Sequence, residues 1–226
     1  TLETARGIAA EYLAPHNQKG DANEPTFDGE KVTLIPETKA AWNALAEAGF
    51  HAAHHDAEDG GLQLPEVILR TCVAYFSAAN ISTSGYSFLT IGSANLVKSF
   101  ASDELRERFL PPMLDGRYSG TMALTEPGQG SALGDIRTTA RPADDGSYRV
   151  FGQKMFISGG DHELTDNIVH MVLARIEGAP AGVKGISLFL VPKVLVNEDG
   201  SLGARNDVAL AGLLHKMGYR NTTSTV

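Results

Sequence analysis

The spacing of apolar residues changes near Ser119, and this change divides the chain into two parts. Before it, apolar residues recur every three to four positions, which is the spacing of one helix face. After it, short apolar runs are separated by turn residues, as in β-strands. The pattern predicts an α+β protein, with an N-terminal helical domain over residues 1–117 and a mainly antiparallel, β-barrel-like domain over residues 118–226.

Five helices are predicted in the first part. Pro36 lies early in one of them and Gly49 follows it, while Ser102 is suited to cap another. The segment Ser82–Phe100 is apolar on nearly all sides, which indicates a central, buried helix. The predicted helices are Thr1–Leu13, Pro36–Ala48, one that opens at Leu64 and Pro65, Ser82–Phe100 and Asp103–Met113.

Seven strands are predicted in the second part. Residues 142–146, Pro-Ala-Asp-Asp-Gly, have turn chemistry at each step and predict a hairpin. The chain starts with Thr and stops within the last strand, so we expect a piece of a longer protein. The predicted strands are Tyr118–Leu124, Arg137–Arg141, Tyr148–Phe151, Gln153–Ser158, Ile168–Arg175, Gly185–Val191 and Thr222–Val226.

Composition excludes several classes of protein. With 226 residues, 42% of them hydrophobic, the chain is not a disordered tail, and its net charge of −8 is the wrong sign for nonspecific nucleic-acid binding. No apolar run reaches the roughly 20 residues of a membrane helix. The single cysteine, Cys72, can form no internal disulfide and is expected as a packed core thiol in a reducing compartment.

The densest chemical signal is Met122–Ser131, MALTEPGQGS, where a strand runs into a Gly/Pro loop. Such a loop can point N–H groups and the hydroxyls of Thr125 and Ser131 at an anion or a polar ring edge; a plain hairpin turn is the alternative. Its G-Q-G-S-A-L-G spacing approaches the dinucleotide-binding fingerprint. We reject that interpretation because Arg137–Ala140 leads into a strand rather than a helix.

A second signal lies about thirty residues further on, at Gly152–Gly160, GQKMFISGG. Phe156 and Ser158 are two apart, so on a strand they share one face. This pair can pack against a flat ring and donate one hydrogen bond to its edge. A core Phe beside a strand-end Ser is the alternative.

These two segments resemble the flavin loop and the second flavin strand of the acyl-CoA dehydrogenase family. Further similar segments surround them: Gly60-Gly61, Phe109-Leu110-Pro111, Leu188–Val191 and His215–Gly218. The insertion Lys193–Leu214 is similar to the branch that includes 3-methylmercaptopropionyl-CoA dehydrogenases.

The resemblance implies FAD as cofactor and seven site residues. Thr125 is expected at the flavin pyrimidine edge, Ser158 at N5 and Phe156 on the ring face away from substrate. Ser131 is also expected close to bound acyl-CoA. The remaining cofactor-binding residues are Met122 and Leu124 along the ring, and Gly130, with Ser131, at the pyrophosphate.

The resemblance also implies the reaction. The full enzyme would oxidise an acyl-CoA thioester to the 2,3-enoyl-CoA and pass electrons to an electron-transfer flavoprotein. It is expected in fatty acid metabolism, as a cytoplasmic homodimer or homotetramer (in the mitochondrial matrix if eukaryotic). The family's catalytic glutamate lies in a later helical bundle, so no catalytic residue is assigned in this chain, and the fragment alone is expected to be inactive.

The sequence departs mildly from the family pattern. Ala132 replaces an acid, Phe156 replaces Trp and Ser158 replaces Thr. Glu126 is interpreted as a brace of the loop rather than as a base.

Other interpretations remain open at this point. An acyl-CoA oxidase or flavin monooxygenase of the same fold, or a non-catalytic helical-plus-barrel binding module, fits the same pattern. His51, His54, His55 and Asp56 are expected in a solvated loop without a metal, and Glu24–Glu30 in another. Lys216 and Arg220 form either a surface pair or a site near the CoA phosphate.

Overall fold

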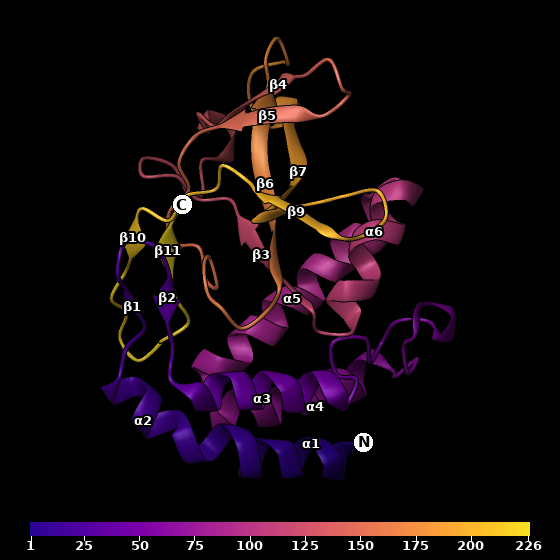
Figure 1. Cartoon of the computed structure of the whole chain (residues 1–226), viewed down its shortest axis with the longest axis vertical. Coiled ribbons are helices and arrows are strands. Elements are labelled where there is room, and N and C mark those ends of the chain that lie inside the picture. Colours follow the sequence, from indigo (N-terminus) through magenta and orange to yellow (C-terminus); the bar gives the residue numbers. More distant parts are fainter.

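Helices fill one end of the molecule and β-strands the other, as Figure 1 shows for the computed structural model, which describes residues 1–226. The last helix of the first part ends at Leu114 and the first strand of the main sheet begins at Tyr118. The predicted α+β class is therefore confirmed.

Six α-helices form the first part, and the predicted ones are all present. Ser102 caps the last of them, as expected, by accepting a hydrogen bond from the backbone N–H of Leu105 at 3.3 Å. The first predicted helix continues as a π-helical turn, Ala9–Leu13, and a 3₁₀ turn, Ala14–His16. The helices are α1 (Leu2–Ile8), α2 (Asn17–Ala22), α3 (Pro36–Glu47), α4 (Glu66–Ala79), α5 (Ile81–Phe100) and α6 (Asp103–Leu114).

One short hairpin interrupts the helical part. It lies where the sequence predicts a solvated loop over Glu24–Glu30. Strand β1 (Thr26–Phe27) pairs antiparallel with β2 (Val32–Thr33). The Asp28 carboxylate closes the turn by accepting hydrogen bonds from the N–H groups of Glu30 and Lys31, both at 2.9 Å. Two-residue strands are too short to show alternation, which is why the pattern missed them.

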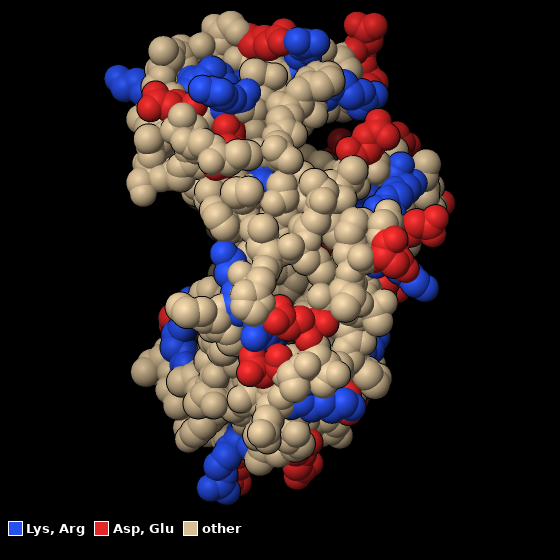
Figure 2. All heavy atoms as spheres, turned by 90° about the vertical axis from the view of Figure 1, so that its left-hand side faces the viewer, with Lys and Arg blue, Asp and Glu red and all other residues tan.

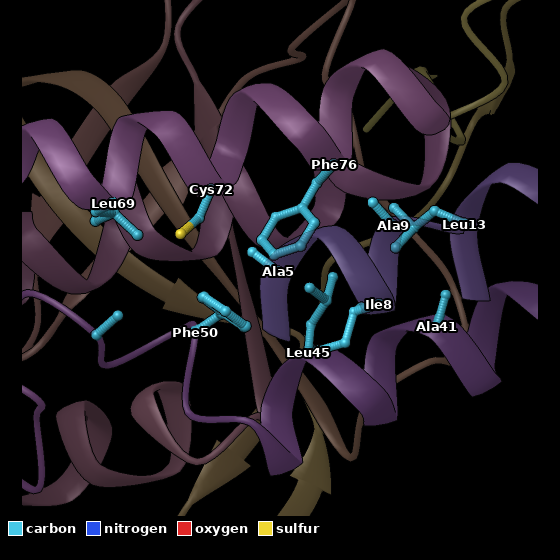
Figure 3. Packing of buried hydrophobic residues seen from close by; sticks show 11 residues of the cluster. Ala5, Ile8, Ala9, Leu13, Ala41, Leu45, Phe50, Leu69, Cys72 and Phe76 are labelled. Atoms are coloured by element: carbon cyan, nitrogen blue, oxygen red, sulfur yellow. The ribbon is translucent and has the colours of Figure 1, made fainter. Parts of the chain in front are cut away.

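The helical core lies where α1, α3 and α4 meet (Figure 3). Small residues on α1 and α3 let the helices approach closely, and Phe50 packs edge-on against Phe76 at 4.9 Å. Cys72 lies within this core and is fully buried, so the predicted packed thiol is confirmed, and burial raises its pKa. The cluster consists of Ala5, Ile8, Ala9, Leu13, Ala41, Leu45, Phe50, Ala53, Leu69, Cys72 and Phe76.

The main sheet has five strands and is mixed. Its longest strand, β6, pairs in parallel with β3 and, at its end, with the start of β4, and antiparallel with β7. Within residues 118–226 antiparallel pairs outnumber parallel ones, as predicted. The remaining strands are β3 (Tyr118–Ala123), β4 (Thr139–Pro142), β5 (Tyr148–Phe151), β6 (Asn167–Ile176), β7 (Ile186–Pro192), β8 (Val194–Val196), β9 (Leu202–Arg205), β10 (Gly212–Leu213) and β11 (Ser224–Thr225).

The predicted strand Gln153–Ser158 is not a regular strand. Phe156 has φ of 60°, a left-handed backbone that interrupts the extended run, and only Ile157 forms a bridge, with Ser224. Phe156 and Ser158 therefore do not share a strand face, because the alternation that would place them there is broken between them.

Helix α5 is central, as predicted, but its buried residues include many hydroxyl side chains beside apolar ones such as Ile91 and Val97. The Thr83 hydroxyl is 2.8 Å from the His16 ring, and the Ser87 hydroxyl is 2.8 Å from the His51 ring. On the side of the sheet, the Thr90 hydroxyl accepts a hydrogen bond from the N–H of Gly120 in β3 at 3.0 Å. These contacts join the helices to the sheet.

The prediction that the histidines lie in a solvated loop is wrong. His51 and His55 are buried, His54 is half-buried, and the His54 ring is hydrogen bonded to Asn95 of α5 at 2.7 Å. The segment folds back on α5 because hydroxyl and amide partners there satisfy one ring nitrogen each of His51 and His54. No group of three or more His, Cys, Asp or Glu side chains is placed to hold a metal ion.

The face that carries β1, β2, β10 and β11 is shown in Figure 2. Acidic and basic side chains are intermixed at the top, along the right-hand edge and over the lower half of this view, and a mostly uncharged band lies between the top and the lower half. No helix of the molecule has both the length and the apolar character that crossing a bilayer requires.

Acid should destabilise the protein through its buried histidines. Burial lowers the pKa of His51 and of His170 to about 4, and that of His162 to about 3, each from 6.5. These folded-state pKa values lie below the unfolded-state value of 6.5. The stability that depends on neutral histidines is therefore fully present above pH 6.5 and is lost as the pH falls toward the folded-state values. Each histidine should lower the free energy of unfolding by about 1.4 kcal/mol per pH unit in that window.

Urea unfolding between about pH 7 and about pH 5 measures this slope. His170→Gln should reduce the slope of the free energy of unfolding against pH by the contribution of one histidine, about 1.4 kcal/mol per pH unit. An unchanged slope in that variant would show that His170 is protonated in the folded state.

Candidate functional site

A buried ion pair holds the loop that follows β3. The Lys154 ammonium donates to Glu126 Oε1 at 2.9 Å and to the backbone oxygen of Leu124 at 3.0 Å. Both side chains are 5% exposed. Such a pair is stable only when its remaining polar atoms are also hydrogen bonded.

The two residues just before β4 supply those hydrogen bonds to Glu126. The backbone N–H of Arg137 donates to Oε2 at 2.7 Å, and Thr138 donates to Oε1 through its N–H and its hydroxyl. Burial alone would raise the pKa of Glu126, but these bonds and Lys154 outweigh it and lower the pKa to about 2. Glu126 is therefore a charged brace of the loop, as the sequence predicted.

Between these anchors the loop makes a tight turn. The backbone groups of Glu126 and Gln129 exchange two hydrogen bonds, at 2.8 and 3.1 Å. The N–H groups of Thr125, Gly130 and Ser131 donate to no acceptor within the chain. The turn thus presents backbone donors to the surroundings, which is the arrangement expected of an anion- or ring-edge-binding loop.

The structure brings the two sequence signals together. The N–H of Met155 donates to the backbone oxygen of Thr125 at 2.8 Å, so the second segment lies directly beside the first. Met122, Leu124 and Thr125 are half-buried, and Phe156 is 51% exposed. Apolar side chains and unpaired donors therefore adjoin one another.

Ser158 lies beyond Phe156, half-buried, where its side chain interacts with the Tyr219 phenol. Burial raises the pKa of Tyr219, and the neighbouring Ser158 hydroxyl partly offsets this effect. Gly130 and Ser131 lie past the turn and make no hydrogen bond to the second segment. The predicted site thus has two regions: one beside Thr125 and the second segment, and one at Gly130 and Ser131 past the turn.

The last residues of the chain complete the site, which sequence analysis did not foresee. Lys154 and Val226 exchange two backbone hydrogen bonds, as do Ile157 and Ser224. The N–H of Gly159 donates to the backbone oxygen of Asn221 at 3.1 Å. The second segment is held on one side by Thr125 and on the other by residues 221–226.

Lys216 and Arg220, for which the sequence allows either a surface pair or a site near the CoA phosphate, make different contacts. Arg220 pairs with Asp21 at 3.0 Å and with Glu24 at 3.4 Å, so it ties this segment to the helical part. Lys216 instead lies over the Phe156 ring, with its ammonium 4.1 Å from the ring centroid.

The sequence analysis also did not identify Lys154 as part of the site. A signal was present, because a lysine set among apolar residues in an expected strand needs an acidic partner when buried. Glu126 was the nearest acidic residue of the first motif.

Two family models match the chain. The N-terminal domain of acyl-CoA dehydrogenase matches residues 1–117, and the middle domain of acyl-CoA dehydrogenase matches residues 121–225. The chain belongs to the acyl-CoA dehydrogenase family.

Similar proteins of known name include two bacterial dehydrogenases. The 3-methylmercaptopropionyl-CoA dehydrogenase of Ruegeria pomeroyi is 38% identical over 225 residues, which cover 100% of this chain and 38% of that protein. A butyryl-CoA dehydrogenase of Syntrophomonas wolfei is 40% identical over 221 residues, covering 96% and 36%. The chain thus spans well under half the length of these relatives.

Solved structures of the family share the fold. The acyl-CoA dehydrogenase of Bacillus anthracis complexed with FAD superposes with a TM-score of 0.75 at 23% identity, over 99% of this chain and 34% of that one.

Loss of the brace should destabilise this acyl-CoA dehydrogenase family member. Glu126→Gln leaves the Lys154 charge buried without a counter-charge, and we expect a loss of about 3 kcal/mol, within the range for broken buried pairs. Lys154→Met should lose less, about 1–2 kcal/mol, because Arg137 and Thr138 still satisfy Glu126. Urea unfolding measures both.

Glu177→Gln is the matched control, since Glu177 forms an exposed ion pair with Arg141. Its effect should stay below about 1 kcal/mol. Equal effects of Glu126→Gln and Glu177→Gln would contradict the brace.

Proposed function

We propose that this chain is the part of an FAD-dependent acyl-CoA dehydrogenase that holds the flavin. The observation that carries the proposal is the Met155–Thr125 hydrogen bond at 2.8 Å, which joins the two motifs into one surface. The family membership supports it, because the two matching domains cover both motifs. We place the domain boundary between residues 117 and 118.

The residues present fit an isoalloxazine ring. Such a ring needs apolar packing on its faces and hydrogen-bond donors at its polar edge. The half-buried Met122 and Leu124 and the half-exposed Phe156 supply apolar surface. The N–H of Thr125 supplies a donor that has no acceptor within the chain.

Each predicted residue receives a role in this proposal. Thr125 holds the pyrimidine edge through its N–H and hydroxyl, and Ser158 donates to N5. Phe156 packs on one ring face, while Met122 and Leu124 line the ring.

The pyrophosphate binds at the turn. Gly130 and Ser131 hold it through N–H groups that donate to no acceptor in the chain, and Ser131 is also close to the acyl-CoA. A carbon added at Gly128 would meet nothing within 4 Å, and at Gly130 only the Thr125 methyl at 4.0 Å, so an extended diphosphate can approach the backbone.

The bound FAD supplies the hydride acceptor for oxidation of an acyl-CoA thioester to the 2,3-enoyl-CoA. The residues of this chain bind the ring, orient it and exclude water from it. Donors at the pyrimidine edge and N5 stabilise the charge that arrives with the hydride. We assign the catalytic base to no residue of this chain.

The wider setting is proposed from the family. The substrate is an acyl-CoA, the electron acceptor is an electron-transfer flavoprotein, and the complete enzyme is a homo-oligomer in fatty acid metabolism. Exposed apolar side chains such as Phe88 on α5, 50% exposed, support association with further protein surface. Peroxide release during turnover would instead favour an acyl-CoA oxidase.

Removing single hydroxyls should separate the roles of the site residues. Thr125→Ala and Ser158→Ala in the full-length protein should each weaken FAD binding or flavin reduction roughly ten- to hundredfold, since a lost partner in a buried site costs about 1–3 kcal/mol. Ser131→Ala should lower FAD content and leave the reduction rate of the bound flavin unchanged. Phe156→Ala should lower FAD content further through lost ring packing.

FAD content and bleaching of the flavin by acyl-CoA measure these effects. Ser147→Ala is the control, because this hydroxyl lies on the exposed β4–β5 turn and contacts Asp145. Wild-type FAD content and bleaching in both Thr125→Ala and Ser158→Ala would overturn the site assignment.

A further inference from the structure

The Lys216 ammonium has an aromatic ring where most cations have a carboxylate. It lies 4.1 Å from the centroid of the Phe156 ring and forms no ion pair within 4.0 Å. Its neighbours on the same segment differ, because His215 and Arg220 both contact Glu24, at 2.9 and 3.4 Å. The face of Phe156 is therefore the main partner of this charge.

The backbone on both sides of this contact is fixed. Phe156 has φ of 60°, which is unusual for an aromatic residue, and the hydrogen bonds of Met155 and Ile157 hold it from either side. At Lys216 the backbone oxygen accepts hydrogen bonds from the N–H of Gly218 and from the Arg220 guanidinium. Local hydrogen bonds thus restrain the backbone at both residues whose side chains form the contact.

The ring itself is less constrained than its backbone. Phe156 is 51% exposed, so side-chain packing leaves much of it free to rotate. An attraction between the ammonium and the ring face restricts that rotation and fixes the ring plane. A preset plane lowers the entropy lost when a second flat ring stacks on it.

We propose that Lys216 is a positioning residue that orients the Phe156 ring for stacking against the flavin. The inference rests on the proposed function and deepens it, since it assigns a residue that acts on the cofactor through another side chain. Its action requires the positive charge and the aromatic ring together. Either alone has no orienting effect.

A double-mutant cycle in the full-length protein tests this role. The variants are Lys216→Met, which keeps the chain length without the charge, Lys216→Arg, Phe156→Leu and the double variant Lys216→Met/Phe156→Leu. FAD is titrated into each apoprotein and binding is followed by flavin fluorescence. Lys31→Met is the matched control, because Lys31 is exposed on the β1–β2 turn and forms no ion pair.

Lys216→Met should weaken FAD binding about two- to fivefold, the size of one exposed cation–π contact. Lys216→Arg should restore wild-type binding, and Lys31→Met should not change it. In the Phe156→Leu background, Lys216→Met should produce no further loss, which a merely structural or a direct electrostatic role would not predict.

Wild-type FAD binding by Lys216→Met, or an equal loss with and without the Phe156 ring, would overturn the positioning role alone. Failure of the wild-type protein to bind FAD would instead overturn the proposed function. The two failures are therefore distinguishable.

Discussion

The site depends on one buried ion pair. Glu126 and Lys154 are each 5% exposed, and charges this deeply buried are stable only with every polar atom satisfied. That requirement makes three separate stretches of chain converge: the loop after β3, Thr138 just before β4, and the segment beginning at Lys154. Once they meet, the N–H groups of the loop turn outward beside apolar side chains. The Glu126–Lys154 pair thus fixes the position of the loop without itself facing a ligand.

The helical part supports this site through α5 and the last residues of the chain. The Ser82 hydroxyl contacts the backbone of Gly218 and Arg220, and the Asn221 amide donates to the backbone oxygen of Ser82 at 2.8 Å. Residues 221–226 then pair with the second motif. Helix α5 therefore connects the two domains through polar contacts as well as through a shared apolar cluster, in which Ala94 and Val97 pack with Val169 and Met171 of β6. Two buried histidines, His16 and His51, are hydrogen bonded to hydroxyls of the same helix.

Local chemistry explains what the sequence could predict. Helix periodicity and the Ser102 cap depend on neighbouring residues, and both are confirmed. The bracing role of Glu126 is also confirmed, but its partners Thr138 and Lys154 lie 12 and 28 residues away along the chain. The left-handed backbone of Phe156 could not be predicted, because it is imposed by Thr125 on one side and by Ser224 on the other. The burial of His51 required partners on α5, 36 residues away along the chain. The β1–β2 hairpin was too short for any period to reveal.

The most direct test of this account is FAD binding by Glu126→Gln in the full-length protein, under conditions where circular dichroism shows that it remains folded. Glu126 is buried behind the loop, so it can affect the flavin only by holding the donors in place. We expect folded Glu126→Gln to bind FAD at least tenfold more weakly than Glu177→Gln, a loss of about 1.4 kcal/mol or more. Equal binding by the two folded variants would contradict it.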